Sequence, residues 1–145
     1  MELKIKKFDA RATVPTYGTE FSAGADLYSM VGDDITVEPH KTVLVHTGLA
    51  FEIPEGYVGL IFARSGIATK RGLAPANKVG VIDADYRGEI MVALHNHSDE
   101  AASLEGGERV AQIAIVPFLK AEFFVVDELS DSVRGAGGFG STGKH

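Results

Sequence analysis

The chain has 145 residues, of which 45% are hydrophobic and 23% charged, and a formal net charge of −6; this is the composition of one globular domain. The acidic balance argues against nucleic acid or an anionic membrane as a partner, since both need a basic face. The absence of cysteine excludes disulfides, thiol catalysis and thiolate metal sites. We find neither a membrane-length apolar run nor the apolar stretch of a signal peptide, so we expect a cytoplasmic protein.

Short segments rich in β-branched residues recur along the chain, separated by glycine and proline about every eight to twelve residues. The expected strands span residues 42–47, 57–62, 90–95, 110–116 and 121–126. Pro54, Glu55 and Gly56 fit a turn between two of these strands. The pattern predicts an all-β fold, as a β-sandwich, a jelly roll or a barrel.

Two segments depart from this pattern. Residues 64–72 predict one short helix, in which Ser65 caps the start and Gly72 ends the helix. From Asp127 the sequence becomes acidic and then glycine-rich, which is typical of a mobile arm. We therefore expect a β-barrel core over residues 1–126 and a flexible C-terminal arm over residues 127–145.

Residues suited to chemistry are concentrated in a few short segments. These are AGADLYS (23–29), ARSG (63–66), GVIDADYRG (80–88), GERVAQ (107–112) and RGAGGFGSTG (134–143). None is decisive alone, because each also has an ordinary structural explanation. The five histidines form no HExxH motif or zinc-deaminase signature, and no G-x-S-x-G elbow is present. We therefore interpret the histidines as bystanders and disfavour a serine hydrolase.

The second and third segments suggest an anion site and a carboxylate base. Arg64, Ser65 and Gly66 offer a guanidinium, a hydroxyl and backbone N–H groups to a phosphate, although an ordinary capped helix explains them as well. Residues 80–88 fit either a hairpin that presents polar groups to a flat ligand or a plain polar turn. Asp83 follows a strand while Asp85 lies in the turn itself, which favours Asp83 as the working acid.

Three further polar residues have two interpretations each. Asp26 fits either a contact to a hydrated cation or an ordinary turn aspartate. Gln112 fits either a ligand contact or the solvent side of an alternating strand. Arg109 fits best as the partner in a structural ion pair.

The glycine-rich tail combines one arginine and one aromatic ring with a loose backbone. Ordering about ten such residues costs on the order of 10–20 kcal/mol of backbone entropy. The arm should therefore close only over a ligand that supplies compensating contacts. Phe139 can stack on such a ligand and Arg134 can bind its anionic oxygens.

The five segments, with the third extended to GVIDADYRGEI (80–90), follow one another over residues 23–143 and resemble the five motifs of the trimeric all-β dUTP pyrophosphatase (dUTPase) family. The visible departure is Ala25, where the family has a larger residue. The resemblance implies a jelly-roll-like β-clip subunit that assembles as a homotrimer. Each active site would take its first, second and fourth motifs from one subunit, its third from another and its arm from a third.

The resemblance also implies the reaction and its parts. With Mg²⁺ as cofactor, dUTP would be hydrolysed to dUMP and pyrophosphate, which lowers dUTP and supplies dUMP for dTMP synthesis. Asp83 would bind the sugar 3′-OH and orient the water that attacks the α-phosphorus. Asp26 would act through the metal's waters, and Phe139 would cover the uracil. The phosphate contacts would come from Arg64, Ser65, Gly66, Gln112, Arg134, Gly140, Ser141 and Thr142.

Uracil selectivity would come from residues in or near the third motif. Backbone groups of Gly80, Val81 and Ile82, together with the Asn77 amide, would match the pairing edge of uracil and mismatch cytosine. Tyr86 beneath the sugar would exclude a 2′-hydroxyl. Met91, just beyond the turn, would be a further contact.

Three rival functions stay open. A dCTP deaminase would share the architecture, but Ala93 stands where that family keeps a catalytic glutamate. A nucleotide-sensing trimer would bind without turnover. A purely structural oligomer would give no reason for the grouping of charged residues in five segments.

Overall fold

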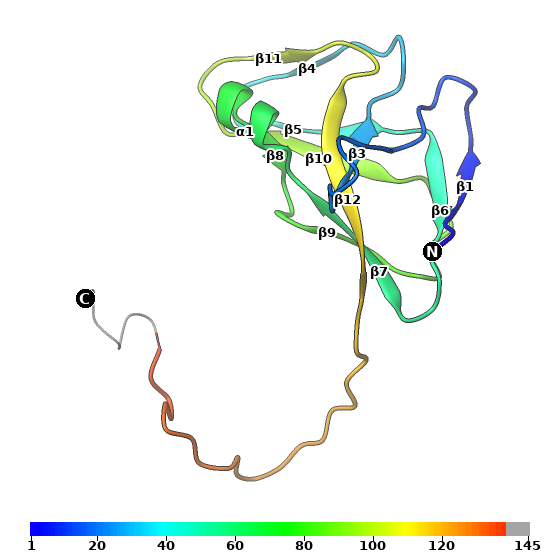
Figure 1. Ribbon diagram of the computed structural model, residues 1–145. Helices are drawn as coiled ribbons and strands as arrows, with labels where there is room; N and C mark the ends of the chain where they lie inside the picture. Colours follow the sequence, from blue (N-terminus) through cyan, green and yellow to red (C-terminus); the bar gives the residue numbers. More distant parts are fainter. Residues whose placement is uncertain (139–145) are drawn as a thin grey trace.

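The structure is a computed structural model that describes residues 1–138, and this part of the chain forms a mostly β body with one short helix (Figure 1). No helix within it is long and apolar enough to cross a membrane. The elements are β1 (Lys4–Lys7), β2 (Thr16–Tyr17), β3 (Ala25–Tyr28), β4 (Ile35–Val37), β5 (Thr42–His46), β6 (Leu49–Glu52), β7 (Tyr57–Phe62), α1 (Ser65–Arg71), β8 (Leu73–Pro75), β9 (Gly80–Ile82), β10 (Met91–Asn96), β11 (Ala102–Leu104) and β12 (Arg109–Pro117).

The strands form four antiparallel sheets. The largest has the order β2-β3-β12-β7-β9, and the next has the order β5-β10-β8. The pairs β1-β6 and β4-β11 complete the body. Strand β12 pairs with β3 on one side and with β7 on the other, so three strands that are far apart in the sequence lie side by side in one sheet.

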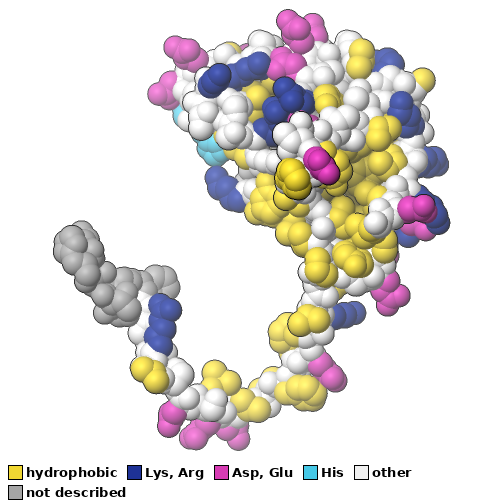
Figure 2. All heavy atoms as spheres, in the orientation of Figure 1, with side chains coloured by type: hydrophobic (Ala, Val, Ile, Leu, Met, Phe, Trp, Pro, Cys, Tyr) yellow, Lys and Arg dark blue, Asp and Glu magenta, His cyan; other side chains and the backbone are white. Residues whose placement is uncertain are grey.

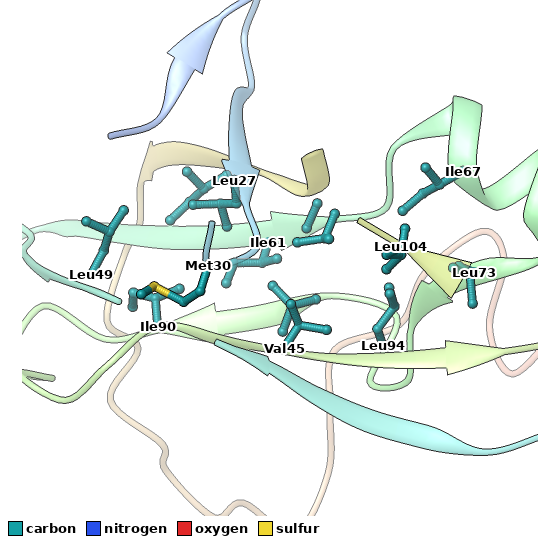
Figure 3. Packing of buried hydrophobic residues seen from close by; sticks show 14 of the residues in the cluster. Leu27, Met30, Val45, Leu49, Ile61, Ile67, Leu73, Ile90, Leu94 and Leu104 are labelled. Atoms are coloured by element: carbon teal, nitrogen blue, oxygen red, sulfur yellow. The ribbon is translucent and has the colours of Figure 1, made fainter. Parts of the chain in front are cut away.

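The apolar core fills the space between these sheets (Figure 3). Leu27 and Ile61 come from the five-stranded sheet, and Val45 and Leu94 come from the three-stranded one. Burying each such side chain contributes about 1.5–3 kcal/mol. In β10 the alternation that directs Leu94 inward directs Met91 and Ala93 outward, so these two residues become available to a surface site.

Most predicted elements are confirmed. Observed strands occupy the predicted ranges 42–47, 57–62, 90–95 and 110–116 within about a residue at each end. The 54–56 turn is also present, because the Tyr57 amide donates to the Pro54 carbonyl at 3.2 Å.

The predicted strand over residues 121–126 is wrong. The last strand ends at Pro117, and residues 118–138 have no helix or strand. The segment has β propensity, but a strand also needs a neighbour to pair with, and this chain places none beside it. Its apolar side chains stand away from the body, with Phe123 92% and Val125 102% exposed (Figure 2).

Of the two alternatives for residues 80–88, the hairpin is wrong. Strand β9 pairs with β7, whereas β10 pairs with β5 and β8. The segment from Asp83 to Ile90 is therefore a connection between two sheets. A local sequence pattern predicts the two strands but does not determine which sheet each one joins.

Candidate functional site

A β-bulge in β12 brings three polar side chains to one face of the five-stranded sheet. Gln112 lies opposite Asp26, and paired residues share a face. The register then shifts between Arg109 and Ala111, so that Arg109 pairs with Tyr28 and Val110 is the extra residue. Without the extra residue Arg109 would point to the other face.

Asp26 is the centre of this group. Its Oδ1 accepts a hydrogen bond from Arg64 Nε at 2.6 Å, and its Oδ2 accepts one from Arg109 Nη1 at 3.3 Å. The Asp26 side chain is only 13% exposed, so the two guanidinium groups compensate a carboxylate that is largely removed from water. The turn-aspartate interpretation of Asp26 is wrong, and the ion-pair interpretation of Arg109 is confirmed.

Gln112 is held in place beside this ion pair by one hydrogen bond and by the room that Gly24 leaves for its side chain. Its Nε2 donates to the Ala63 carbonyl at 2.9 Å, which anchors it to the end of β7. A Cβ at Gly24 would stand 2.5 Å from Gln112 Oε1. Glycine at position 24 therefore leaves the room that the glutamine side chain occupies, so Gln112 does not simply face solvent.

Helix α1 follows directly on β7 and carries the second predicted segment. Its N-cap is Arg64, and no side chain caps the start, so the prediction that Ser65 caps the helix is wrong. Ser65 and Gly66 lie exposed in the first turn. Gly72 ends the helix in the left-handed region, with φ 67°, as predicted.

An ion pair attaches the far end of α1 to the segment before β12. Arg71 Nη2 donates to Glu108 Oε2 at 2.8 Å, and Arg71 Nη1 donates to the Ser103 carbonyl at 3.1 Å. The hydrogen bond from Arg71 holds the pKa of Glu108 below its ordinary value of 4.5, with the Glu105 amide helping and burial opposing. This pair fixes α1 relative to Arg109.

A second group of predicted residues surrounds a surface hollow of about 240 Å³. Its walls come from β9, the connection after β9, and the outward face of β5 and β10. A smaller adjoining hollow of about 80 Å³ includes Gly80. The structure thus brings together the residues predicted to read the base and sugar: Asn77, Val81, Ile82, Asp83, Tyr86 and Met91. Ala93 also lines this hollow, without a carboxylate.

The connection that carries Asp83 is braced by its own residues. The Tyr86 amide donates to the Asp83 carbonyl at 3.2 Å, which closes a turn. Arg87 Nη1 donates to the carbonyls of Ala84 at 2.6 Å and of Tyr86 at 3.0 Å. Gly88 lets the Tyr86 ring lie against the backbone, since a Cβ there would overlap the ring. These contacts hold the connection in place, and the Asp83 side chain on it is exposed.

The two groups lie at opposite ends of β7 within one chain. Ile82 pairs with Gly59, so Asp83 lies toward the start of β7, whereas Arg64 follows its end. At about 3.3 Å per strand residue, the backbone positions of Asp83 and Arg64 are roughly 15–20 Å apart. Within one chain, Asp83 therefore lies far from the group formed by Asp26, Arg64 and Arg109, which we call the arginine group.

Leu44 and Glu89 line the hollow, His46 is hydrogen-bonded to Glu89, and none of the three was among the predicted site residues. Glu89 lines the hollow, and its Oε2 accepts a hydrogen bond from His46 Nδ1 at 2.9 Å. Glu89 directly follows Gly88 within the motif GVIDADYRGEI, so this further acid of the motif was the signal that could have found it. No local pattern signals His46, because its contact spans 43 residues.

The tail is described only in part. Arg134 is exposed, and its Nε donates to the Gly137 carbonyl at 2.8 Å. The predicted contacts of Phe139, Gly140, Ser141 and Thr142 lie outside the described residues.

The donor set fits a metal that arrives with a ligand. Within residues 1–138, no three His, Cys, Asp or Glu side chains gather as around a protein-held ion. Asp26 is one carboxylate beside two arginines, which suits water-mediated contact to a phosphate-bound Mg²⁺. Such an ion keeps most of its own waters and needs few protein ligands.

These features define a jelly-roll-type, all-β protein with an arginine-centred polar group and a separate polar hollow. The sequence model of the dUTPase family matches residues 10–143. The chain belongs to the dUTPase family.

Individual proteins agree with this assignment. The deoxyuridine 5′-triphosphate nucleotidohydrolase of Nautilia profundicola is 52% identical over 144 residues, covering 99% of this chain and 100% of the relative. The Staphylococcus bacteriophage 80alpha dUTPase, solved with dUPNHPP, superposes with a TM-score of 0.90 at 32% identity and covers 98% of both chains. A mutant dUTPase of phage phi11 of S. aureus, described with a structural Mg(II) ion, gives 0.80 at 27% identity over 88% of this chain and 98% of that chain.

The Arg71–Glu108 pair makes a pH-dependent contribution to stability. Because the folded-state pKa of Glu108 is lowered, the contribution is complete above pH 4.5 and is lost as the pH falls through the folded-state value. We expect Glu108→Gln to lower the free energy of unfolding at pH 7 by a few tenths to about 1 kcal/mol. Denaturant titrations at pH 7 and near pH 3 measure this difference, which should shrink at the lower pH.

The matched control is Glu105→Gln, an exposed acid three residues earlier. It should leave the stability unchanged at both pH values. An equal loss for Glu108→Gln at both pH values would contradict a role for its charge.

Proposed function

We propose that this chain is a dUTP diphosphatase, which hydrolyses dUTP to dUMP and pyrophosphate. The observation that carries the proposal is the hollow in which Asn77, Asp83, Tyr86 and Met91 meet, on the segment that resembles the family's third motif. The named relatives and the dUTP analogue bound to the 80alpha protein give the same substrate. A cytoplasmic location is part of the proposal, because dUTP is an intracellular nucleotide.

The hollow selects the base and the sugar. Backbone groups of residues 80–82 and the Asn77 amide pair with the edge of uracil, and cytosine would leave buried polar groups unmatched at about 1–3 kcal/mol each. Tyr86, held against Gly88, lies under the deoxyribose and leaves no room for a 2′-hydroxyl.

The arginine group takes the triphosphate. Arg64, Ser65, Gly66 and Gln112 supply the donors, and Arg64 is pre-oriented because its Nε is fixed on Asp26. Asp26 would hold Mg²⁺ through water, and the ion would neutralise part of the phosphate charge. Catalysis then rests mainly on positioning and on charge stabilisation.

Asp83 activates the water. Its exposed carboxylate accepts a hydrogen bond from the 3′-OH and a proton from the water that attacks the α-phosphorus. The new bond joins the water oxygen to the α-phosphorus, and the bond to the bridging oxygen breaks. Pyrophosphate leaves and dUMP remains.

The distance between the two groups supports a homotrimer with shared sites. A general base works only within hydrogen-bond reach, and Asp83 lies roughly 15–20 Å from Arg64 in one chain. A site that uses both groups therefore needs Asp83 of one copy beside Arg64 of another. A cyclic trimer supplies three such sites.

The tail completes the site from a third copy. In this proposal residues 1–126 form the core and residues 127–145 form an arm that covers a neighbour's nucleotide. Phe139 stacks on uracil, while Arg134, Gly140, Ser141 and Thr142 contact the phosphates. The exposure of residues 119–136 supports this proposal, because their side chains do not pack against the body of their own chain.

One substrate panel tests the activity against its rivals. The purified protein is incubated with dUTP, dTTP, dCTP or UTP, with and without Mg²⁺, and pyrophosphate and ammonia are measured. We expect pyrophosphate from dUTP with Mg²⁺ and little product from the others. Ammonia from dCTP would identify a deaminase, and tight dUTP binding without turnover would identify a sensor.

Asp83→Asn tests the base. The amide keeps the shape of the side chain but does not take up a proton, so we expect kcat to fall by roughly 10²–10⁴-fold while dUTP affinity changes little. Steady-state kinetics and calorimetric titration measure the two quantities. Asp85→Asn, in the same turn, is the control and should stay near the wild-type rate.

Mixing two inactive variants tests the shared site. Asp83→Asn and Arg64→Ala should each be nearly inactive, yet a 1:1 mixture refolded together should regain activity in about a quarter of its sites. Those sites combine the intact half of each variant. If each subunit held a complete site, the mixture would stay inactive.

Removal of residues 134–145 tests the arm. We expect the truncated protein to keep its oligomeric state by light scattering, because the core is untouched. Its kcat/KM for dUTP should fall by at least about a hundredfold, because the arm's contacts position the nucleotide. Full activity would rule out the capping role.

A further inference from the structure

The Glu89 carboxylate joins the connection after β9 to the turn between β5 and β6. Its Oε1 accepts a hydrogen bond from the Gly48 amide at 2.8 Å, and its Oε2 accepts one from His46 Nδ1 at 2.9 Å. The Glu89 side chain is 25% exposed, so these bonds are only partly open to competition from water. We call this set of contacts the Glu89 clamp.

The turn that donates hydrogen bonds to Glu89, residues 46–48, is fixed to the core. Thr47 is fully buried, and its hydroxyl donates to the Ile90 carbonyl at 2.6 Å. The Ile90 amide in turn donates to the Leu49 carbonyl at 2.7 Å. A side chain that binds residues 46–48 is therefore tied to the core.

The other end of the clamp reaches the hollow. The Tyr86 hydroxyl donates to the Glu89 backbone carbonyl at 3.0 Å. Met91 lies opposite His46 in the pairing of β10 with β5, and both Glu89 and Met91 line the hollow. A movement of Glu89 would thus shift the Tyr86 ring through the hydrogen bond that holds its hydroxyl.

We propose that Glu89, oriented by His46, is a positioning residue that sets the place of Tyr86 and thereby the selection of deoxyribose over ribose. This inference rests on the proposed function for its substrate. Glu89 contacts Tyr86 and the core, and the chemistry stays with Asp83. Without the clamp, Tyr86 moves and the hollow admits a 2′-hydroxyl.

The test compares turnover of dUTP and UTP in Glu89→Ala, Glu89→Gln and His46→Ala. We expect Glu89→Ala to lower the ratio of kcat/KM for dUTP over UTP by about ten- to a hundredfold, mainly through a lower KM for UTP, because the hollow then admits the 2′-hydroxyl. Glu89→Gln keeps an acceptor for Gly48 and should restore most of the selectivity. His46→Ala removes one contact and should give an intermediate loss.

The matched control is Glu52→Ala, which removes an exposed ion pair with Lys4 and should leave the ratio unchanged. Hydrogen exchange of the Gly48 and Tyr86 amides provides a readout without substrate. Both amides should exchange faster in Glu89→Ala and near the wild-type rate in Glu89→Gln.

The two proposals fail in different ways. No turnover of dUTP by the wild type would overturn the proposed function, and the exchange rates would still decide whether Glu89 fixes the turn. Unchanged selectivity and unchanged exchange in Glu89→Ala would overturn the clamp. If Glu89→Ala does not fold, unchanged values in His46→Ala, whose side chain is 58% exposed, would overturn it.

Discussion

The arrangement of the polar site depends on one largely buried carboxylate, Asp26, and the two guanidinium groups that compensate it. A charge taken out of water is tolerated only with a partner, and removing one partner of a fully buried pair costs on the order of 3–5 kcal/mol. The ion pair therefore links β3 to the start of α1 and to β12. It also leaves Arg64 in a fixed orientation, so that less side-chain entropy remains to be lost when an anion binds.

The same site shows which of its features the local sequence could predict and which it could not. The segments that carry Arg64, Asp83 and Gln112 are short and contiguous, so their residue types alone indicate an anion site and a carboxylate base. Strand β7 and the end of α1 at Gly72 were predictable because their signals are local. The partners of Asp26 were not predictable, since they lie 38 and 83 residues away.

Long-range pairing also explains two of the wrong predictions. Residues 121–126 have a strand-like composition, but no strand of the chain lies beside them to pair with. Residues 80–88 looked like a hairpin, although β9 and β10 join different sheets. Ser65 looked like a cap, but the extended backbone falls one residue earlier, at Arg64. The first two errors concern where a segment sits relative to others, which composition does not encode, and the third is a local shift of one residue.

The extra residue at Val110 has a consequence for protein engineering. Side-chain direction alternates along a strand, so Arg109 and Gln112, three positions apart, would face opposite ways on a regular ladder. Transplanting Asp26, Arg109 and Gln112 onto another β-scaffold therefore requires copying the β-bulge as well as the amino acids. A graft onto an ideal strand would deliver the correct residues and send one of them to the wrong side.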